Sequence, residues 1–237
     1  MTLREAAPGV DLGLSVDPSP ARLPQPTTVA GRYVTLVPLD PVAHAQPLYE
    51  KSHGPECESL WRYLFDGPYP DRSSFDARLA QMASARDPLF FSILDQATVP
   101  LGYASYMRIE PAHRCIEVGS ILFTPELQRT PGATEAMYLM ARHVFEDLGY
   151  RRYEWKCNAL NQPSRRAALR LGFTFEGVFR QHMIIKGRNR DTAWYSMLDS
   201  EWPQRKANFE RWLAPANFAG GGRQKKSLAR MNGAAEP

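Results

Sequence analysis

A turn between a strand-like and a helix-like segment carries the residue types needed to bind phosphate groups. The turn "QRTPGAT" (128–134) follows the run "CIEVGSILFT" and leads into the run "ATEAMYLMARHVFEDL". A helix N-terminus presents unpaired N–H groups and a partial positive charge, so anions bind there. Pro131 lies inside this turn and has no N–H to donate. The sequence therefore predicts either a diphosphate site with one donor fewer, or only a tight strand-to-helix turn around Gly132.

A second polar turn opens a later helix. In "NQPSRRAALRLGF", Asn161 and Ser164 precede an amphipathic run that ends at Gly172. Ser164 has the type of a helix N-cap and Asn161 the type of a turn residue, so both also have ordinary structural interpretations. The pair lies one strand–helix–strand unit after the first turn, which raises the odds that both turns serve one ligand.

The order of the predicted elements indicates a mixed sheet. Period-two runs predict strands, and capped amphipathic runs predict helices. Strands are expected over 32–39, 89–95, 100–110, 115–124, 151–159, 173–185 and 191–198. Helices are expected over 40–52, 55–65, 73–85, 133–148, 164–173 and 200–213. This order predicts an α/β or α+β fold with a twisted sheet of about seven strands and flanking helices, partly parallel around 115–157 and 151–180.

The two ends of the chain differ from its middle in composition. Of the 237 residues, 43% are hydrophobic and 23% are charged, which suits one folded unit with a sizeable core. Residues 1–28 are Pro-rich and aperiodic, and 219–237 are Gly-rich and basic; both are predicted to be disordered, flanking a domain over 29–218. No signal peptide or membrane span is recognised, and Cys57, Cys115 and Cys157 lie too far apart for a metal motif. A cytoplasmic protein with reduced thiols and no metal is expected.

Three segments in this order carry a family resemblance. "LQRTPGATEA", then "NQPSRRAALRLGF", then "FEGVFRQHMIIKGRNRDTAWYSMLDSEW" together resemble the GNAT acyltransferase superfamily, and within it the RimJ/RimL-like branch. The resemblance covers about residues 30 to 212. It implies a mostly antiparallel sheet with splayed central strands, and transfer of an acetyl group from acetyl-CoA to an amine.

The resemblance also implies where acetyl-CoA binds. Gln128 to Ala133 match the family's pyrophosphate loop, with Pro131 where the family usually has Gly; the N–H donors that remain are on Arg129, Thr130, Gly132, Ala133 and Thr134. The main chain of Ile121, Leu122 and Phe123 is expected to pair with the pantetheine arm like an added strand. Asn161 and Ser164 match positions that contact the cofactor. Arg165, Arg166 and Arg170 either approach the adenosine phosphates or form a solvated helix face.

Acetyl transfer by direct attack in a ternary complex needs a base, because an alkylammonium has a pKa near ~10.4. Glu117 is the candidate, as a carboxylate in an apolar strand whose burial would raise its pKa; the alternative is a surface or salt-bridged carboxylate. His113 and Glu154 are rivals for this role. Ser164 is the candidate to bind the leaving thiolate, and Tyr195 is a lesser one that also fits core packing. A covalent mechanism through Cys115, close to His113, lacks a third orienting group.

The acceptor is less well determined by the sequence. The aromatic residues Trp61, Tyr63, Phe65 and Tyr69 fit either a border of the acceptor pocket or plain core packing. A small-molecule amine and a protein N-terminus both remain open as acceptors, as do a monomer and a homodimer. Two other classes are kept: a non-catalytic acyl-CoA-binding module, favoured by Pro131, and a nucleic-acid binder, favoured only by the net charge of +4 and the basic tail. No specific nucleic acid or membrane is expected as a partner.

Overall fold

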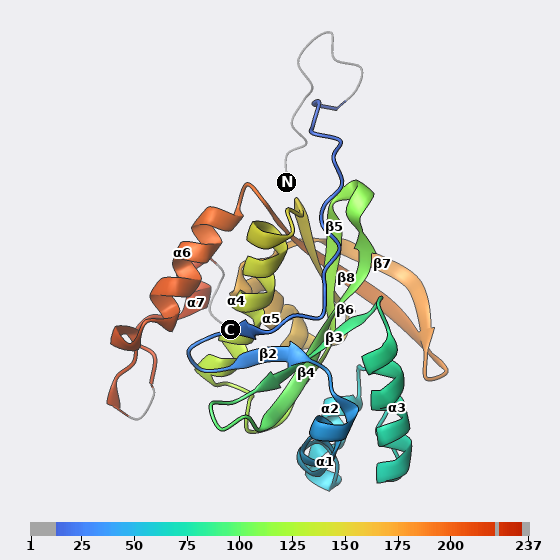
Figure 1. The fold of residues 1–237 in the computed structure, drawn as a ribbon. Coiled ribbons are helices and arrows are strands. Elements are labelled where there is room, and N and C mark those ends of the chain that lie inside the picture. Colours follow the sequence, from blue (N-terminus) through green and yellow to red (C-terminus); the bar gives the residue numbers. More distant parts are fainter. Residues whose placement is uncertain (1–12, 221–222, 234–237) are drawn as a thin grey trace.

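One twisted sheet organises the computed structural model, which describes residues 13–220 and 223–233 (Figure 1). Its eight strands lie in the order β1-β2-β3-β4-β5-β6-β8-β7. The strands are β1 Val29–Ala30, β2 Thr35–Pro38, β3 Leu89–Leu94, β4 Pro100–Glu110, β5 Cys115–Phe123, β6 Arg152–Asn158, β7 Thr174–Ile185 and β8 Arg188–Leu198. All neighbouring pairs are antiparallel except β5 and β6, which run parallel. The mixed, mostly antiparallel sheet predicted from the sequence is confirmed.

Helices cover the two faces of this sheet unequally (Figure 1). They are α1 Pro41–Ser52, α2 Glu58–Trp61, α3 Arg72–Ser84, α4 Pro131–Arg142, α5 Gln162–Leu171, α6 Trp202–Leu213 and α7 Leu228–Met231. The large core joins one face to α4 through α7, and a smaller cluster joins α1 through α3 to Phe90, Tyr103 and Leu122 on the other. The second face is therefore covered over β3 to β5, while no helix of the described residues lies on its β6–β8 half.

Alternation along β6 shows why the two faces differ. Tyr153, Trp155 and Cys157 are buried against α5, and the residues between them, Glu154 and Lys156, face the opposite side. Successive side chains of a strand point to opposite faces, so the polar residues of this strand lie on the half of the second face where the described residues place no helix. The sequence pattern thereby places charges beside β5 and β6, the only parallel pair among the described strands.

Three predicted elements differ from the structure. The sheet has eight strands rather than about seven, because Val29–Ala30 adds a short edge strand to β2. The predicted helix over 55–65 is reduced to a 3₁₀ turn and α2, and residues 62–71 form a loop that contains the helix-breaking pair Gly67–Pro68. The unit over 151–180 is not a parallel pair, because β8 lies between β6 and β7. Among the described residues, no helix has the length and apolarity needed to cross a bilayer.

Parts of both predicted tails pack on the domain. In the arm, the N–H groups of Ala21 and Arg22 donate to the carbonyls of Pro111 and Leu148, at 3.0 and 2.9 Å. At the other end, Leu228 of α7 is 0% exposed and joins the large core. The predicted disorder is therefore corrected for these two segments, since a few apolar residues suffice to dock them. Residues 1–12, 221–222 and 234–237 of the predicted tails lie outside the described residues, and the domain limits 29–218 stay a prediction.

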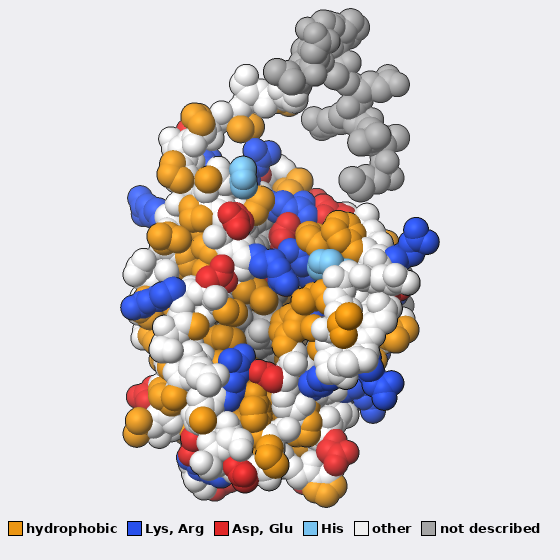
Figure 2. Space-filling model, turned by 90° about the vertical axis from the view of Figure 1, so that its right-hand side faces the viewer, with side chains coloured by type: hydrophobic (Ala, Val, Ile, Leu, Met, Phe, Trp, Pro, Cys, Tyr) orange, Lys and Arg blue, Asp and Glu red, His pale blue; other side chains and the backbone are white. Residues whose placement is uncertain are grey.

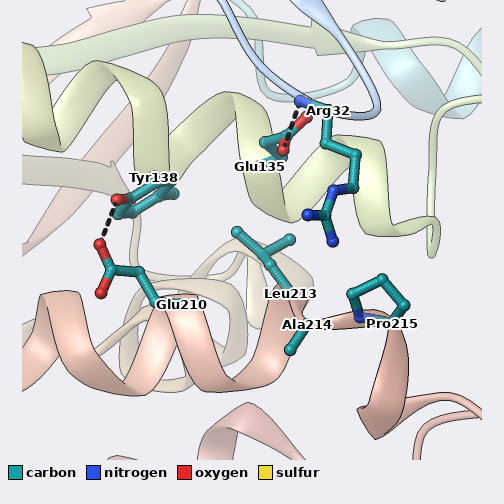
Figure 3. Close-up of a pocket in the computed structure, with 7 residues that line it drawn as sticks. All are labelled: Arg32, Glu135, Tyr138, Glu210, Leu213, Ala214 and Pro215. Carbon is teal, nitrogen blue, oxygen red and sulfur yellow. Dashed lines mark hydrogen bonds between the residues drawn. The ribbon is translucent and has the colours of Figure 1, made fainter.

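A buried carboxylate fixes α4 to the start of the sheet. Glu135 accepts hydrogen bonds from the main-chain N–H groups of Arg32, Tyr33 and Val34, at 2.9, 2.5 and 3.0 Å. Figure 3 shows Glu135 reaching this turn, at one side of a cavity of about 330 Å³ between α4 and α6. Because Glu135 lies in the second turn of α4, these bonds also hold the N-terminus of the helix in place.

Replacing Glu135 should therefore destabilise the whole fold. Glu135→Ala removes the acceptor of three N–H groups, and we expect unfolding free energy to fall by roughly 2–4 kcal/mol, because unsatisfied buried donors are costly. Glu135→Gln keeps one acceptor oxygen and should lose less. Urea denaturation of both variants measures the difference; equal stability of the alanine variant and the wild type would contradict the assignment.

Candidate active site

The parallel strands β5 and β6 separate at their carboxyl ends. Their pairing runs from Cys115↔Arg152 to Val118↔Trp155 and stops there. Beyond this point β5 continues to Phe123 paired only with β4, and β6 continues to Asn158 paired only with β8. Ser120 has a φ of 49°, at a bulge that shifts the register of β5 against β4. Main-chain groups of both strands therefore border a gap in which an extended ligand can take the place of a strand.

The turn before α4 lies directly after this gap. Thr130 is the N-cap of α4, and its Oγ1 accepts from the N–H of Ala133 at 3.2 Å. The N–H of Thr130 itself donates to the carbonyl of Leu127 at 3.3 Å, and Pro131 takes the first helical position. Of the N–H donors that the sequence analysis expected to bind the pyrophosphate, those of Thr130 and Ala133 thus already have acceptors in the chain. The N–H groups of Arg129, which has a φ of 61°, and Gly132 lie before the first intrahelical donor.

Gly132 faces the core rather than the gap. A Cβ at this position would lie 2.8 Å from Cγ1 of Val34, which is itself 3% exposed. The glycine is therefore required by the close approach of α4 to the first strands. Thr134 is also buried, and its Oγ1 accepts from Arg170 at 3.0 Å.

The two polar residues of the turn before α5 both have structural partners, and the N-cap is Asn161 rather than Ser164. Oδ1 of Asn161 caps the helix by accepting from the N–H of Ser164 at 3.2 Å. Nε1 of Trp155 donates to Oγ of Ser164 at 3.0 Å. A hydroxyl that accepts such a bond still has its own hydrogen to donate. Trp155 is the last residue of β6 that pairs with β5, so the hydroxyl of Ser164 is held where the two strands separate.

The three arginines of α5 have different surroundings. Arg165 donates from Nε to the hydroxyl of Tyr195 at 3.1 Å, and Tyr195 is 1% exposed, as expected for core packing. Burial raises the pKa of Tyr195. Arg170 lies over the ring of Trp212 at 4.9 Å, and burial lowers its pKa. Arg166 is the exposed one of the three.

A row of charges crosses the second face of the sheet, from β4 to β7. Glu117 on β5 is 3% exposed and pairs with Arg108 at 2.7 Å and with Lys156 at 2.9 Å. Lys156 also pairs with Glu154 at 2.6 Å and lies 3.9 Å from the ring centre of Trp194. The sequence placed Glu117 in an apolar strand, with a salt-bridged carboxylate as the alternative. The structure shows the salt bridges, because the neighbouring strands β4 and β6 each bring a cation to Glu117, and its role as the base stays a prediction.

Glu154 continues this row. Burial would raise its pKa, but hydrogen bonds from Lys156 and Arg152 outweigh burial and lower it. Arg152 bridges Glu154 and Glu176, at 2.6 and 2.5 Å. Figure 2 shows the side of the molecule with α3 and the β7–β8 hairpin, where basic and acidic side chains lie together around a hollow.

His182 on β7 is a site residue that the sequence reasoning missed. Its Nδ1 lies 3.0 Å from Oγ1 of Thr192, and its ring centre lies 6.0 Å from that of Trp194. Burial and the positive charges of Arg108, Arg190 and Lys156 lower its pKa, while Glu117 opposes them. His182 also lines an open hollow of about 630 Å³ with Phe179, Arg180 and Gln181. It is therefore a neutral, accessible imidazole beside the charged row.

The rival nucleophile and base from the sequence are less well placed. His113 is exposed in the turn before β5. The thiol of Cys115 donates to the main-chain carbonyl of His113 at 3.4 Å, and burial raises its pKa. The imidazole of His113 is not the partner of this thiol, so the pair does not form a thiolate–imidazolium couple.

Comparison with known proteins agrees with this geometry. A family model described as an acetyltransferase (GNAT) domain matches residues 34–174. The crystal structure of a GCN5-related N-acetyltransferase from Brucella melitensis is 47% identical, covers 91% of this chain and 98% of that chain, and superposes with a TM-score of 0.88. The chain belongs to the GNAT acetyltransferase family. A GNAT-family protein from Chromobacterium violaceum is 39% identical over 84% of this chain and 98% of its own, with a TM-score of 0.74.

A curated relative points to one branch of the GNAT family. The ribosomal-protein-serine acetyltransferase of Escherichia coli (strain K12) is 30% identical over 103 residues, which is 43% of this chain and 56% of that protein. The chain thus spans about half the length of the curated relatives it matches. The predicted resemblance to the RimJ/RimL-like branch is confirmed by these relatives.

The aromatic segment 61–69 lies only partly at the open ends of β5 and β6. Trp61 is 0% exposed and donates from Nε1 to the carbonyl of Ser52 at 2.7 Å, so it belongs to the core. The hydroxyl of Tyr63 donates to the carbonyl of Leu160 at 3.2 Å, across the open ends of the strands. Phe65 lies under the guanidinium of Arg190 at 5.2 Å. Burial raises the pKa of Tyr69, which packs with the aromatic cluster of α1 and α3.

The packing role assigned to Gly132 has a direct test. Gly132→Ala should lower unfolding free energy by roughly 1–3 kcal/mol through overpacking against Val34. Adding Val34→Ala removes the clash, so the double variant should be more stable than the sum of the single losses predicts. Urea denaturation of all four proteins measures this coupling. Strictly additive losses would show that the added methyl group does not meet Val34.

Proposed function

We propose that the protein transfers an acetyl group from acetyl-CoA to a primary amine by direct attack in a ternary complex. The observation that carries the proposal is the separation of β5 from β6 after Val118 and Trp155. This gap ends at the turn of α4 and is bordered on one face by the charged row. Membership of the GNAT family supports the reaction class.

Acetyl-CoA would lie along this gap. Its pantetheine amides would pair with the main chain of Ile121 to Phe123, while Leu122 keeps its side chain in the core. The pyrophosphate would meet the N–H groups of Arg129 and Gly132 at the start of α4, where the helix dipole also favours an anion. Gln128 supports this turn, since its Nε2 donates to the carbonyl of Phe123 at 2.9 Å.

The remaining predicted contacts have narrower roles in this proposal. Thr130, Ala133 and Thr134 shape the turn, and Asn161 holds the start of α5. Arg166 is exposed and free to approach the adenosine phosphates. Ser164 donates its hydroxyl hydrogen to the departing thiolate. The negative charge of the thiolate strengthens this hydrogen bond.

The proton of the amine needs an acceptor on the charged face. We propose His182, because its lowered pKa keeps the imidazole neutral at pH 7 and the residue is exposed. Glu117 is already engaged by Arg108 and Lys156, and it stays the second candidate. The amine nitrogen forms a bond to the acetyl carbon, the carbon–sulfur bond breaks, and the proton passes to His182. A main-chain N–H at the gap stabilises the oxyanion.

The ternary complex predicts a specific kinetic pattern. With a panel of primary amines and peptides, free CoA should appear only in the presence of an acceptor. Initial rates at varied concentrations of both substrates should give intersecting lines, and Cys115→Ser should remain active because no acetyl-enzyme forms. Parallel lines would contradict direct attack. CoA binding without CoA release for any acceptor would favour a non-catalytic acyl-CoA-binding module.

A pH series separates His182 from Glu117. Wild-type kcat/KM should rise as pH increases towards the pKa of His182, which lies below its usual 6.5, and level off above it as the imidazole becomes neutral. For His182→Gln, the rate at pH 7 should be lower by about 10²–10⁴. It should keep rising with pH until the amine itself deprotonates near ~10.4.

Glu117→Gln is the matched comparison in this series. We expect it to keep the wild-type plateau, since the imidazole remains in place, and to lose stability because Lys156 and Arg108 lose a partner. If Glu117→Gln shows the continuous rise and His182→Gln shows the plateau, Glu117 is the base.

A further inference from the structure

Arg190 on β8 is a buried cation without an ion pair. The residue is 6% exposed, and its Nε is buried without a hydrogen-bond partner. No other hydrogen bond or ion pair of its guanidinium is found within residues 13–220 and 223–233. Two other cations on this face are paired: the buried Lys156 binds two carboxylates, and so does the half-buried Arg152.

An unpaired charge in this position is costly. Burying a cation without a compensating anion disfavours the folded state, and an arginine side chain does not escape the cost by losing its proton. The charge of Glu117 reaches Arg190, but that carboxylate is already engaged by Arg108 and Lys156. The face of Phe65 offers only a weak cation–π contact at 5.2 Å. The guanidinium is therefore placed for an anion that residues 13–220 and 223–233 do not supply.

Arg190 belongs to the same face as the proposed base. Along β8, Arg190, Thr192 and Trp194 point to one side because side chains alternate. Thr192 contacts His182, and Trp194 contacts Lys156. A ligand held by Arg190 would thus lie one or two residues along the strand from the imidazole that receives the proton.

Contacts among three loop segments enclose the part of the second face where Arg190 lies. Nζ of Lys186, in the turn between β7 and β8, donates to the carbonyls of Trp61 and Gly67, at 2.8 and 2.6 Å. The hydroxyl of Tyr63 reaches Leu160 in the turn after β6. The loop 62–71, the hairpin and the β6–α5 turn are therefore tied together above Arg190. This enclosure favours a small acceptor over a long peptide.

We propose that Arg190 binds a carboxylate of the acceptor, so that the substrate is a small amine that carries a carboxylate a few bonds from its nitrogen. The inference rests on the proposed acetyl transfer and names its acceptor class. A guanidinium offers two parallel N–H donors that match a carboxylate, and such bonds are charge-assisted. The carboxylate is fixed by Arg190 while the amine points along the strand to His182.

Matched acceptors test this assignment. CoA release is measured with free amino acids, including those with a terminal side-chain amine, and with the carboxamide of each. We expect kcat/KM to be at least tenfold higher for the carboxylates. The amine of an amino acid amide is the less basic of the two, so a preference for the acid does not arise from amine protonation. Equal rates for acid and amide, or faster acetylation of peptides, would overturn the proposal.

Variants of Arg190 locate the preference. Arg190→Met should raise KM for the carboxylate at least tenfold, leave the amide nearly unchanged and leave KM for acetyl-CoA unchanged. Arg190→Lys keeps the charge and should retain part of the preference. Arg188→Met is the matched control, because it removes an exposed arginine two residues away on the same strand. A loss of kcat for acid and amide alike, with KM unchanged, would assign Arg190 to the reacting groups and overturn its role in acceptor binding.

Two controls keep the outcomes distinct. Thermal melting shows whether Arg190→Met is folded, and the acid-to-amide ratio of the wild type tests the proposal without any variant. Absence of CoA release with every amine and peptide would instead refute the proposed function itself.

Discussion

The separation of β5 from β6 is the constraint on which the rest of the site depends. Two parallel strands that stay paired bury their main-chain groups in each other, and nothing is left for a ligand. Here the pairing ends at Val118 and Trp155, while β4 and β8 continue to hold the outer edges of the two strands. The bulge at Ser120 turns β5 away, and Ser105 secures it by donating to the carbonyl of Gly119 at 3.0 Å. The gap is thus a feature of backbone geometry, and side chains have only to shape its two faces.

The two faces of the gap are shaped by different physical means. On the helix side, neutral contacts dominate: a capping threonine, a glycine pressed against Val34, and a serine held by an indole. On the other side, buried charges are balanced against one another across β4, β5, β6 and β7. Such networks cost desolvation energy, but they fix the geometry of the site, because a buried ion that moves away from its partner is left as an uncompensated charge. Arg190 stands out against this background because the same strands that balance the other charges leave it unbalanced.

Local signals predicted the fold better than the site. The strand, turn and helix around Pro131 are determined by consecutive residues and are present in the structure. The start of α5 was predicted less well, because Asn161 rather than Ser164 caps the helix. The partners of Glu117 are not determined by consecutive residues, because Arg108 and Lys156 come from strands on either side of it. The sequence analysis missed His182 for another reason, which is an irregularity in β7. Period two places Phe179 and His182 on opposite faces, but both rings pack against Trp194, at 4.4 and 6.0 Å. A bulge with Gln181 at a φ of 50° reverses the alternation between them.

The bonds of Lys186 to the carbonyls of Trp61 and Gly67 join the turn between β7 and β8 to the segment around the loop 62–71. Together with the contact of Phe65 to Arg190, they hold the hairpin and the loop together, and all of these contacts must break before the two segments can move apart. An acceptor could then reach Arg190 past these two segments only during such openings. Motions of loops on this scale occur in microseconds to milliseconds, and in many enzymes they set the pace of turnover rather than the chemical step. In this molecule the rate at which acceptors enter and leave would depend on how strongly the ammonium of Lys186 is bound by two carbonyl oxygens.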